Sequence, residues 1–382
     1  PDFVVNLGNP AEIRALHRQD GQTDIYFVVH SGKEPVSAAL SFRVKGKVPE
    51  IWLPKSGKRA DAAFWGPQGD HTRVLLALEP DDAVFVVFRR NAAGENPVRV
   101  ITRTAEFSGH HMIGHHYLPD NTFNQQSVDR LGPPVPGVSL VRDAAGNLRL
   151  RAARTGQYEI IFADGKSARA AIQALPKAIE LGGPWEVAFT SGLGQPGQAQ
   201  FPILQSWTEH PDPAVKFFSG TGTYRKEVTV PPDALRNCVR AVLDLGAVRS
   251  LAQVKVNGQD LGVVWSQPFA VDVTAALRPG VNEVTIAVTN TWRNRLIGDE
   301  QLPSDTEWGE PRMFRRTIAT GRPLKRYPDW LIQGQPRPVA ERQTFVSWNY
   351  FNRDSALMPS GLLGPVQLRF ESDVVIAMPK DP

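Results

Sequence analysis

The stretch LAQVKVNGQDLG, residues 251–262, decides the fold class of this chain. Apolar and polar residues alternate up to Val256, and Asn257-Gly258 then interrupts the pattern. A two-residue Asn-Gly turn between alternating runs is the strongest short-range signal of a β-hairpin. The stretch therefore predicts two antiparallel strands that are joined at Asn257-Gly258.

Similar short runs, each bounded by turn-forming residues, lie on both sides of this hairpin. We expect them to form strands at 220–230, 240–245, 269–273, 282–289, 344–348 and 364–370. Many short strands with turns between them are typical of a β-sandwich or jelly roll. Residues 179–376 are therefore predicted to form one jelly roll.

The N-terminal half shows the same kind of pattern, without a helical period of useful length. Residues 1–105 are predicted to form a β-sandwich unit with strands at 24–30, 39–44, 72–78 and 83–89. Residues 106–178 are predicted to be a long connection followed by a small β unit, in which a turn at 143–147 joins two strands as a hairpin. The whole chain is expected to be all-β, with tandem antiparallel β-sandwich units.

Composition excludes several classes of function. The 382 residues carry 43 Lys and Arg against 39 Asp and Glu, and the basic residues are scattered rather than clustered. We therefore expect no nucleic acid as a partner. The longest apolar runs are too short to span a bilayer, so a membrane is not expected as a partner either. A single cysteine, Cys238, excludes an internal disulfide and is expected to be a half-buried structural thiol.

The start of the sequence has the character of a cut. Pro1-Asp2-Phe3 runs directly into patterned sequence. We therefore expect these residues to be the C-terminal part of something longer, with a processed natural N-terminus as the alternative.

Three tryptophans, Trp265, Trp292 and Trp348, are candidates for sugar contact. An indole can pack on the apolar face of a pyranose ring, while nearby polar groups bind its hydroxyls. Asn294, Arg295 and Asp299 share a predicted loop, residues 291–310, with Trp292 and are the candidate polar groups. The alternative is that the tryptophans fill a core or an interdomain seam, as large aromatic residues commonly do.

Histidines and carboxylates provide further candidate groups. His17 and Arg18 lie just before the first predicted strand, where they either reach into a cleft or form a surface pair. His110, His111, His115 and His116 form the most metal-like cluster, but no carboxylate-rich shell completes it, so we assign no metal ligand. A dense acidic group is either a calcium-binding loop or a solvated loop; it consists of Asp299, Glu300, Asp305, Glu307 and Glu310.

Several longer motifs carry a resemblance to known families. The segments GTGTYRKEV (220–228), 243–262 and 268–290 resemble the galactose-binding-like jelly roll of the family 2 glycoside hydrolases. TWRNRLIGD (291–299) and PSGLLGPV (359–366) resemble the C-terminal end of the α-L-rhamnosidases of glycoside hydrolase family 106. Upstream, 17–29, 42–58 and 81–90 resemble the β region that follows the catalytic barrel in the same family.

This resemblance implies a parent protein with an N-terminal (β/α)-barrel. It implies that the parent removes terminal α-L-rhamnose with inversion, using two carboxylates and a calcium ion near the sugar. No strand–helix alternation is present to build a barrel here, so we expect the catalytic carboxylates to lie outside these residues. The expected partners are a rhamnose-containing carbohydrate and the barrel itself, and the expected location is periplasmic or secreted.

Two other interpretations stay open at this point. The chain is alternatively a free-standing carbohydrate-binding or scaffolding module without activity. It is also compatible with the tail of a polysaccharide lyase, because such modules do not specify the chemistry.

Overall fold

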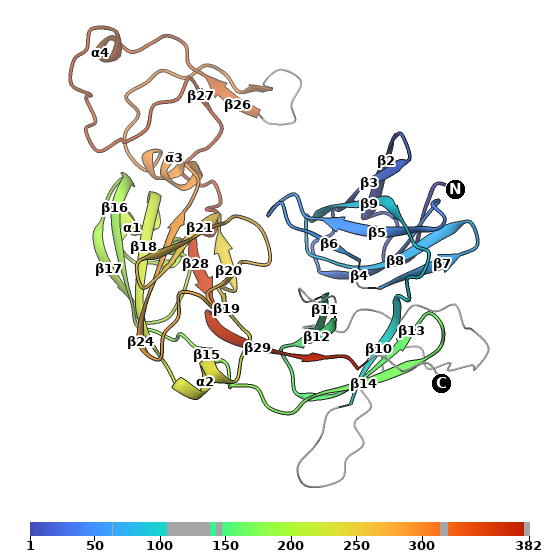
Figure 1. Ribbon diagram of the computed structural model, residues 1–382. Coiled ribbons are helices and arrows are strands. Elements are labelled where there is room, and N and C mark those ends of the chain that lie inside the picture. The colour runs from blue at the N-terminus through green and yellow to red at the C-terminus, as the bar shows by residue number, and fades with distance from the viewer. Residues whose placement is uncertain (63, 105–137, 143–146, 314–319, 378–382) are drawn as a thin grey trace. The chain divides into compact units, whose positions relative to one another are not determined.

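The computed structural model describes residues 1–62, 64–104, 138–142, 147–313 and 320–377. Strands make up 52% and helices 7% of these residues, which confirms the all-β prediction. The chain divides into two compact units (Figure 1). Unit 1 comprises residues 1–177, 236–240 and 370–382, and unit 2 comprises residues 178–235 and 241–369. The predicted three-part division at 105/106 and 178/179 stays a prediction.

Unit 1 begins with a sandwich of two antiparallel sheets. The first sheet has the strand order β1 (Phe3–Leu7), β4 (Val36–Phe42), β8 (His71–Leu78) and β7 (Trp65–Gln68). The second has the order β2 (Ile13–Asp20), β3 (Thr23–His30), β9 (Ala83–Asn91), β5 (Lys47–Trp52) and β6 (Arg59–Asp61). The alternation that predicted these strands supplies the side chains between the two sheets.

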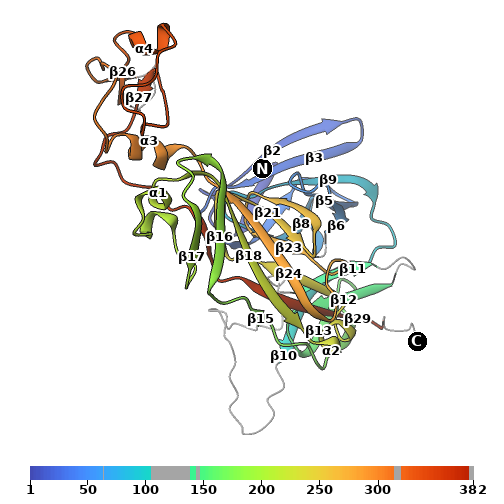
Figure 2. The same cartoon turned by 90° about the vertical axis from the view of Figure 1, so that its left-hand side faces the viewer.

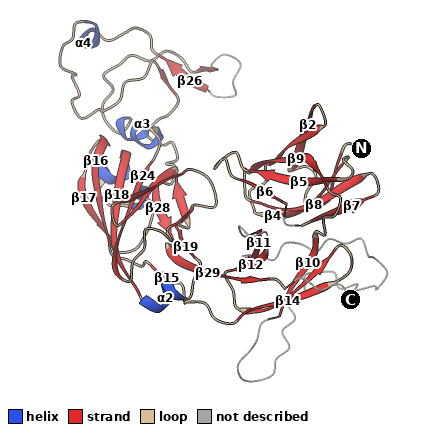
Figure 3. Cartoon of the chain, viewed as in Figure 1, coloured by secondary structure: helices blue, strands red, loops and turns tan. Residues whose placement is uncertain are grey.

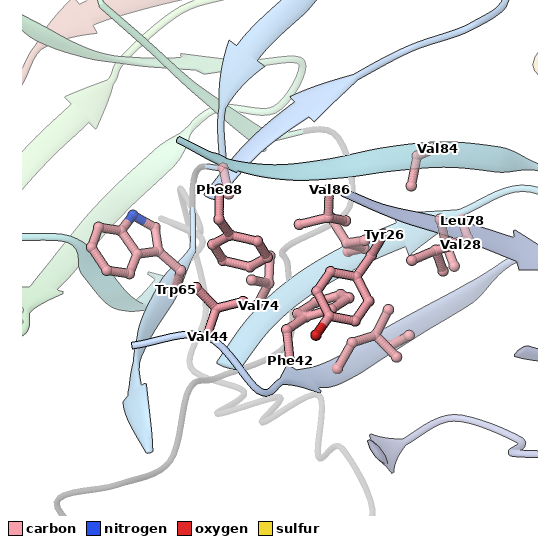
Figure 4. Close-up of a cluster of buried hydrophobic side chains, with 14 of the residues drawn as sticks. Tyr26, Val28, Phe42, Val44, Trp65, Val74, Leu78, Val84, Val86 and Phe88 are labelled. Carbon is pink, nitrogen blue, oxygen red and sulfur yellow. The ribbon is translucent and has the colours of Figure 1, made fainter. Parts of the chain in front are cut away.

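The core of this sandwich is aromatic and β-branched (Figure 4). Tyr26, Phe42 and Phe88 are fully buried, and the ring of Tyr26 lies 4.8 Å from that of Phe42. Burying each such side chain stabilises the fold by about 1.5–3 kcal/mol. Every second residue of β3 points into this core, as a strand requires.

The rest of unit 1 is a smaller β region. One sheet contains β10 (Val98–Thr104), β13 (Gly156–Phe162) and β14 (Ser167–Ile172). Another pairs β11 (Val138–Arg142) with β12 (Leu148–Ala152), which in turn pairs with the second half of β29 (Gln367–Val375). Tyr158, Ile160 and Phe162 of β13 are buried in a second apolar cluster. The predicted hairpin turn at 143–147 lies almost wholly outside the described residues.

Unit 2 is a β-sandwich. Its main sheet has the order β17 (Gly197–Phe201), β16 (Trp185–Leu193), β18 (Ser219–Val230), β24 (Gly280–Thr289), β21 (Leu251–Val256) and β22 (Gln259–Val264). Figure 2 shows β16, β18 and β24 side by side. The other strands of the sandwich are β15 (Ile179–Glu180), β19 (Arg240–Asp244), β20 (Ala247–Arg249), β23 (Ala270–Asp272), β28 (Gly361–Gly364) and the first half of β29.

The predicted Asn257-Gly258 hairpin is confirmed between β21 and β22. Both residues have positive φ, 52° and 80°, which a tight hairpin turn requires. The Asn257 side chain also donates to the carbonyl of Ala276 and accepts from the amide of Glu283. The turn is therefore fixed to the neighbouring strand connection as well as to its own hairpin.

Helices are short and few (Figure 3). They are η1 (Trp207–Glu209), α1 (Pro213–Lys216), α2 (Pro232–Arg236), α3 (Arg293–Asp299) and α4 (Asp329–Ile332). A small sheet of β25 (Arg312–Met313), β26 (Thr320–Pro323) and β27 (Trp348–Asn349) lies between α3 and the end of the chain.

Two local predictions are wrong. Residues 344–347 are not a strand, because Thr344 binds α3 instead of a neighbouring strand. The segment after Thr291 was expected to be a loop, but Arg293–Asp299 forms α3.

The sandwich of unit 2 depends on the buried hydroxyl of Tyr224. It accepts hydrogen bonds from Nε1 of Trp207, at 2.6 Å, and from the amide of Leu362, at 3.1 Å. Burial raises the pKa of this phenol far above its ordinary value, so it stays neutral. One hydroxyl thus joins β18, η1 and β28 inside the core.

We predict that Tyr224→Phe lowers the free energy of unfolding by about 2 kcal/mol or more, because two buried donors lose their acceptor. Urea denaturation of this variant and of Tyr350→Phe, at a side chain that is 43% exposed, provides the comparison. Equal stability of the two variants would contradict the assigned role of the Tyr224 hydroxyl.

Candidate functional site

Residues 292–358 form a subregion of unit 2 that we call the cap. It begins at α3 and includes α4 and the small β25–β26–β27 sheet (Figure 1). Among its described residues, no apolar side chain beyond Ile297 is buried. Its other fully buried side chains are polar, and its remaining apolar side chains are half-buried or exposed. Polar side chains therefore make up most of the fully buried interior of the cap.

The first anchor of the cap is Asp299 at the end of α3. One carboxylate oxygen accepts hydrogen bonds from the amides of Gln343 and Thr344 and from the Thr344 hydroxyl, at 3.0, 2.7 and 2.6 Å. The other oxygen lies 3.0 Å from the guanidinium of Arg295, one helical turn earlier. Asp299 is only 1% exposed. This carboxylate therefore fixes a distant segment of the cap onto α3.

The second anchor is a chain of ion pairs. Glu300 binds Arg342 at 2.6 Å and Arg322 at 3.2 Å. Asp305 binds Arg337, and its other oxygen lies 3.5 Å from Nε of Arg342. Sequence reasoning missed these arginines because each lies at least 20 residues from its carboxylate.

The acidic group therefore divides into two kinds of residue. Asp299, Glu300 and Asp305 are occupied by arginines and backbone amides, whereas Glu307 and Glu310 are exposed. Asp299, Glu300 and Asp305 therefore form neither a calcium-binding loop nor a solvated loop. They do not fit a calcium ion, because arginines already neutralise them and the ion needs six to eight oxygen ligands. In the described part of the chain, no cluster of His, Cys, Asp and Glu has the geometry to hold a metal ion.

A small cavity adjoins this network. Its lining includes Glu300, Trp308, Arg342 and Asn349. Nε1 of Trp308 is buried there and has no partner among the described residues. The cavity has room for about one water molecule, so it does not admit a sugar ring.

The predicted polar neighbours of Trp292 face inward. Asn294 donates to the carbonyl of Met358 at 2.7 Å and to the Ser360 hydroxyl at 2.8 Å, and it is 2% exposed. Arg295 and Asp299 are buried as the ion pair described above. These three side chains support the base of the cap and do not lie beside an exposed indole. The i, i+4 spacing of Arg295 and Asp299 was the one sequence signal of this arrangement.

The tryptophans behave differently from one another. Trp292 is 60% exposed and Trp265 is 59% exposed, so neither fills the core. Trp348 is half-buried, with the guanidinium of Arg312 5.4 Å from its ring centre. The core tryptophans of unit 2 are Trp185 and Trp207. Sugar contact by Trp265 and Trp292 stays a prediction that their exposure permits.

His17 and Arg18 do not act as a pair. They are successive residues of β2, so their side chains lie on opposite faces of the sheet. The His17 ring stacks on Tyr26 at 4.0 Å, and its nitrogens lie 2.9 Å from Asp2 and 3.2 Å from Asp24. Both nitrogens can donate only when the ring is protonated. Arg18 is exposed on the other face.

The two remaining candidates are the histidine cluster and Cys238. The cluster of His110, His111, His115 and His116 lies outside the described residues. Cys238 is half-buried, and burial raises the pKa of its thiol, which disfavours the nucleophilic thiolate.

Comparisons with known proteins now add to this geometry. Residues 1–65 match the family model described as alpha-L-rhamnosidase, of glycoside hydrolase family 106. Residues 213–333 match the model described as glycosyl hydrolase 2 galactose-binding domain-like. The solved rhamnosidase from Novosphingobium sp. PP1Y is 28% identical, with a TM-score of 0.60 over 97% of this chain. The resemblance to the rhamnosidases is confirmed.

The chain spans only a part of these relatives. It covers 25% of the Novosphingobium rhamnosidase chain. A curated protein of Formosa agariphila that carries beta-glucuronidase in its name is 26% identical over 96% of this chain, which spans 43% of that protein. Separately, no helix within the described residues has the length and apolar character needed to cross a membrane.

We predict that Asp299→Asn destabilises the protein by about 3–5 kcal/mol, because it leaves the buried guanidinium of Arg295 without its countercharge. The matched control is Glu307→Gln, whose ion pair with Arg326 is more than half exposed. That control should change stability by less than about 0.5 kcal/mol. Urea denaturation followed by tryptophan fluorescence measures both, and equal effects would contradict the anchoring role of Asp299.

Acid stability should report on Asp2. Burial tends to raise the pKa of its carboxyl, but hydrogen bonds from Arg43 and His17 outweigh burial and hold it below the ordinary value of 3.8. The stabilisation from Asp2 is therefore fully present above pH 3.8 and is lost as the pH falls through the lower, folded pKa.

We expect Asp2→Asn to lose less stability than the wild type between about pH 5 and about pH 2. Denaturant midpoints across this range provide the measurement. Asp70→Asn, at a carboxylate that is 88% exposed, should follow the wild type. An Asp2→Asn curve parallel to the wild-type curve would show that Asp2 makes no such contribution.

Proposed function

We propose that this chain is the C-terminal, non-barrel part of a glycoside hydrolase that removes terminal α-L-rhamnose from glycans or glycosides. The observation that carries the proposal is the match over 97% of the chain to a solved rhamnosidase, of which the chain spans 25%. The family-model match at residues 1–65 supports the same assignment.

The chemistry of the proposed parent enzyme belongs to residues outside this chain. An inverting glycosidase needs an acid and a base about 6.5–9.5 Å apart, with a water molecule between them. In the cap, the carboxylates of Asp299, Glu300 and Asp305 are each paired with arginine, so their oxygens are already engaged in structural contacts. These carboxylates therefore have a structural role in the cap. This is consistent with a catalytic barrel that supplies the acid and the base and is the partner of this chain.

The cap supplies one wall of the active-site pocket in this proposal. Trp292 stands exposed immediately before α3, and Asn294 and Asp299 fix that helix to segments around residues 358 and 344. An aromatic side chain on such a rigid support is preorganised for contact with a sugar or with the pocket rim. Aromatic and arginine side chains are also typical of interface centres.

One observation favours a different substrate. The Formosa agariphila relative is a beta-glucuronidase by name, and it matches 96% of the chain. The test therefore compares an aryl α-L-rhamnoside with an aryl β-D-glucuronide. The enzyme to use is the long protein, meaning the product of the continuous reading frame that contains these 382 residues.

Each outcome of this test assigns a class. Hydrolysis of the rhamnoside supports the proposal. Hydrolysis of the glucuronide alone would make a β-D-glucuronide, and not an α-L-rhamnoside, the substrate of the enzyme. A reading frame with no barrel would instead favour a free-standing carbohydrate-binding or scaffolding module. Cleavage of a polysaccharide by β-elimination would favour the tail of a lyase. A signal sequence at the start of the frame would support the proposed periplasmic or secreted location.

We predict that Trp292→Ala lowers kcat/KM of the long protein on an aryl rhamnoside by about 10-fold or more, equivalent to about 1.4 kcal/mol. Ile203→Ala, at another strongly exposed apolar residue of unit 2, should keep full activity. Steady-state kinetics with circular dichroism as the folding check decides the matter. Unchanged kinetics in a folded Trp292→Ala protein would end the pocket-wall role.

A further inference from the structure

The strand β3 is apolar on both faces. Tyr26 and Val28 point into the sandwich core and are fully buried. Ile25, Phe27 and Val29 point to the opposite face and are partly exposed. The outer face of a sandwich sheet ordinarily carries polar residues, so this second apolar face requires an explanation.

The pairing register extends this face across four strands. Leu16 of β2 lies opposite Phe27, Phe27 opposite Phe85 of β9, and Phe85 opposite Trp52 of β5. Directly opposed residues share one face of a sheet, so these four side chains form a continuous line that we call the outer row. The rings of Phe27 and Phe85 are in contact, with centres 4.9 Å apart. Leu16 is 57% exposed.

The rim of the outer row is basic. Arg14 and Arg18 flank Leu16 on the same face of β2, and within the described part of the chain neither has a carboxylate at ion-pair distance. At the far end, the guanidinium of Arg59 stacks on Trp52 at 4.1 Å. Glu50, the acidic residue nearest to Trp52, is already paired with Arg89 at 3.0 Å. Asp20 is the one carboxylate on this face of β2, so the face combines an apolar centre with an excess of positive charge.

The width of the outer row indicates what can cover it. Leu16 and Arg59 lie on the first and the last of five adjacent strands, about 19 Å apart at the normal strand spacing. Two packed helices have axes about 8–10 Å apart and together span this width. The described helices all lie between Trp207 and Ile332 and have at most seven residues, so none of them is suited to cover a sheet.

We propose that the outer row docks two adjacent helices of the catalytic domain, whose apolar stripe is flanked by Asp or Glu side chains. The inference rests on the proposed function, because it takes its partner from the part of the rhamnosidase that this chain does not span. Apolar contact with Leu16, Phe27 and Phe85 would supply affinity, and acidic side chains opposite Arg14 and Arg18 would fix the orientation.

The test is cysteine labelling of the long protein and of the 382-residue chain. Leu16→Cys and Leu7→Cys are each made in a Cys238→Ser background. Leu7 is the matched control because it is 47% exposed and lies on the other sheet of the sandwich. We expect a maleimide to label Leu16→Cys about 100-fold more slowly in the long protein than in the chain alone, since a covered thiol reacts only on local opening. Leu7→Cys should react at the same rate in both.

A second variant tests the charge of the partner. Arg18→Glu in the long protein should restore rapid labelling of Leu16→Cys, because it places like charges together, whereas Arg18→Lys should not. Equal labelling of the two arginine variants would overturn an acidic partner.

The other outcomes are equally decisive. Rapid labelling of Leu16→Cys in a long protein that hydrolyses rhamnoside would overturn the docking face and leave the proposed function intact. Protection of Leu16→Cys in a long protein without rhamnosidase activity would support docking and remove the proposed substrate. Slow labelling of Leu16→Cys in the 382-residue chain alone would overturn the proposed partner. If labelling slows further as the protein concentration rises, a second copy of the chain covers the outer row. If the rate does not depend on concentration, a segment of the same chain covers it.

Discussion

Every sheet in this protein has to bury one face, and this constraint organises both units. In unit 1, Tyr26 and Phe88 fill the space between the two sheets. In unit 2, the same requirement brings Trp207 and Tyr224 into the core, where their polar atoms must find partners. The Tyr224 hydroxyl meets that demand by accepting from Trp207 and from the backbone of β28. Burial and hydrogen bonding are thus satisfied together, which gives the sandwich one specific arrangement rather than a loosely packed core.

The cap follows a different rule. Buried ion pairs contribute little net stability, because desolvation offsets their attraction, but breaking one is costly. The network from Asp299 to Arg342 therefore favours one arrangement of the cap through directional polar contacts. Directional contacts of this kind can hold a segment whose apolar side chains, such as Tyr327 and Ile332, point outward. Exposed aromatic and arginine side chains of this kind are typical of the surface that a protein uses to bind another domain or protein.

The sequence is informative where structure depends on neighbouring residues and uninformative where it depends on distant ones. The alternation of apolar and polar residues predicted β3, and Asn257-Gly258 predicted the hairpin of β21 and β22. Both signals act within a few residues. The strand expected at 344–348 is wrong for residues 344–347, because Thr344 bonds to Asp299, 45 residues away. No local pattern reports such a contact. For the same reason the family resemblance could be recognised, whereas the inward orientation of Asn294 and Asp299 could not. The exposure of Trp292 likewise required the folded chain.

The outer row and Trp292 both expose apolar side chains, but they differ in what fixes their position, and this difference bears on their roles. The outer row lies on regular strands, so its shape is fixed by backbone pairing and suits contact with a rigid layer. Trp292 lies at the start of a helix whose position depends on side-chain anchors, so small changes in those anchors would move it. A docking face tolerates little movement because it must match many contacts at once. A pocket rim needs its aromatic group placed accurately but contacts few atoms. We therefore assign affinity for the rest of the proposed enzyme mainly to unit 1, and contact near the substrate to the cap.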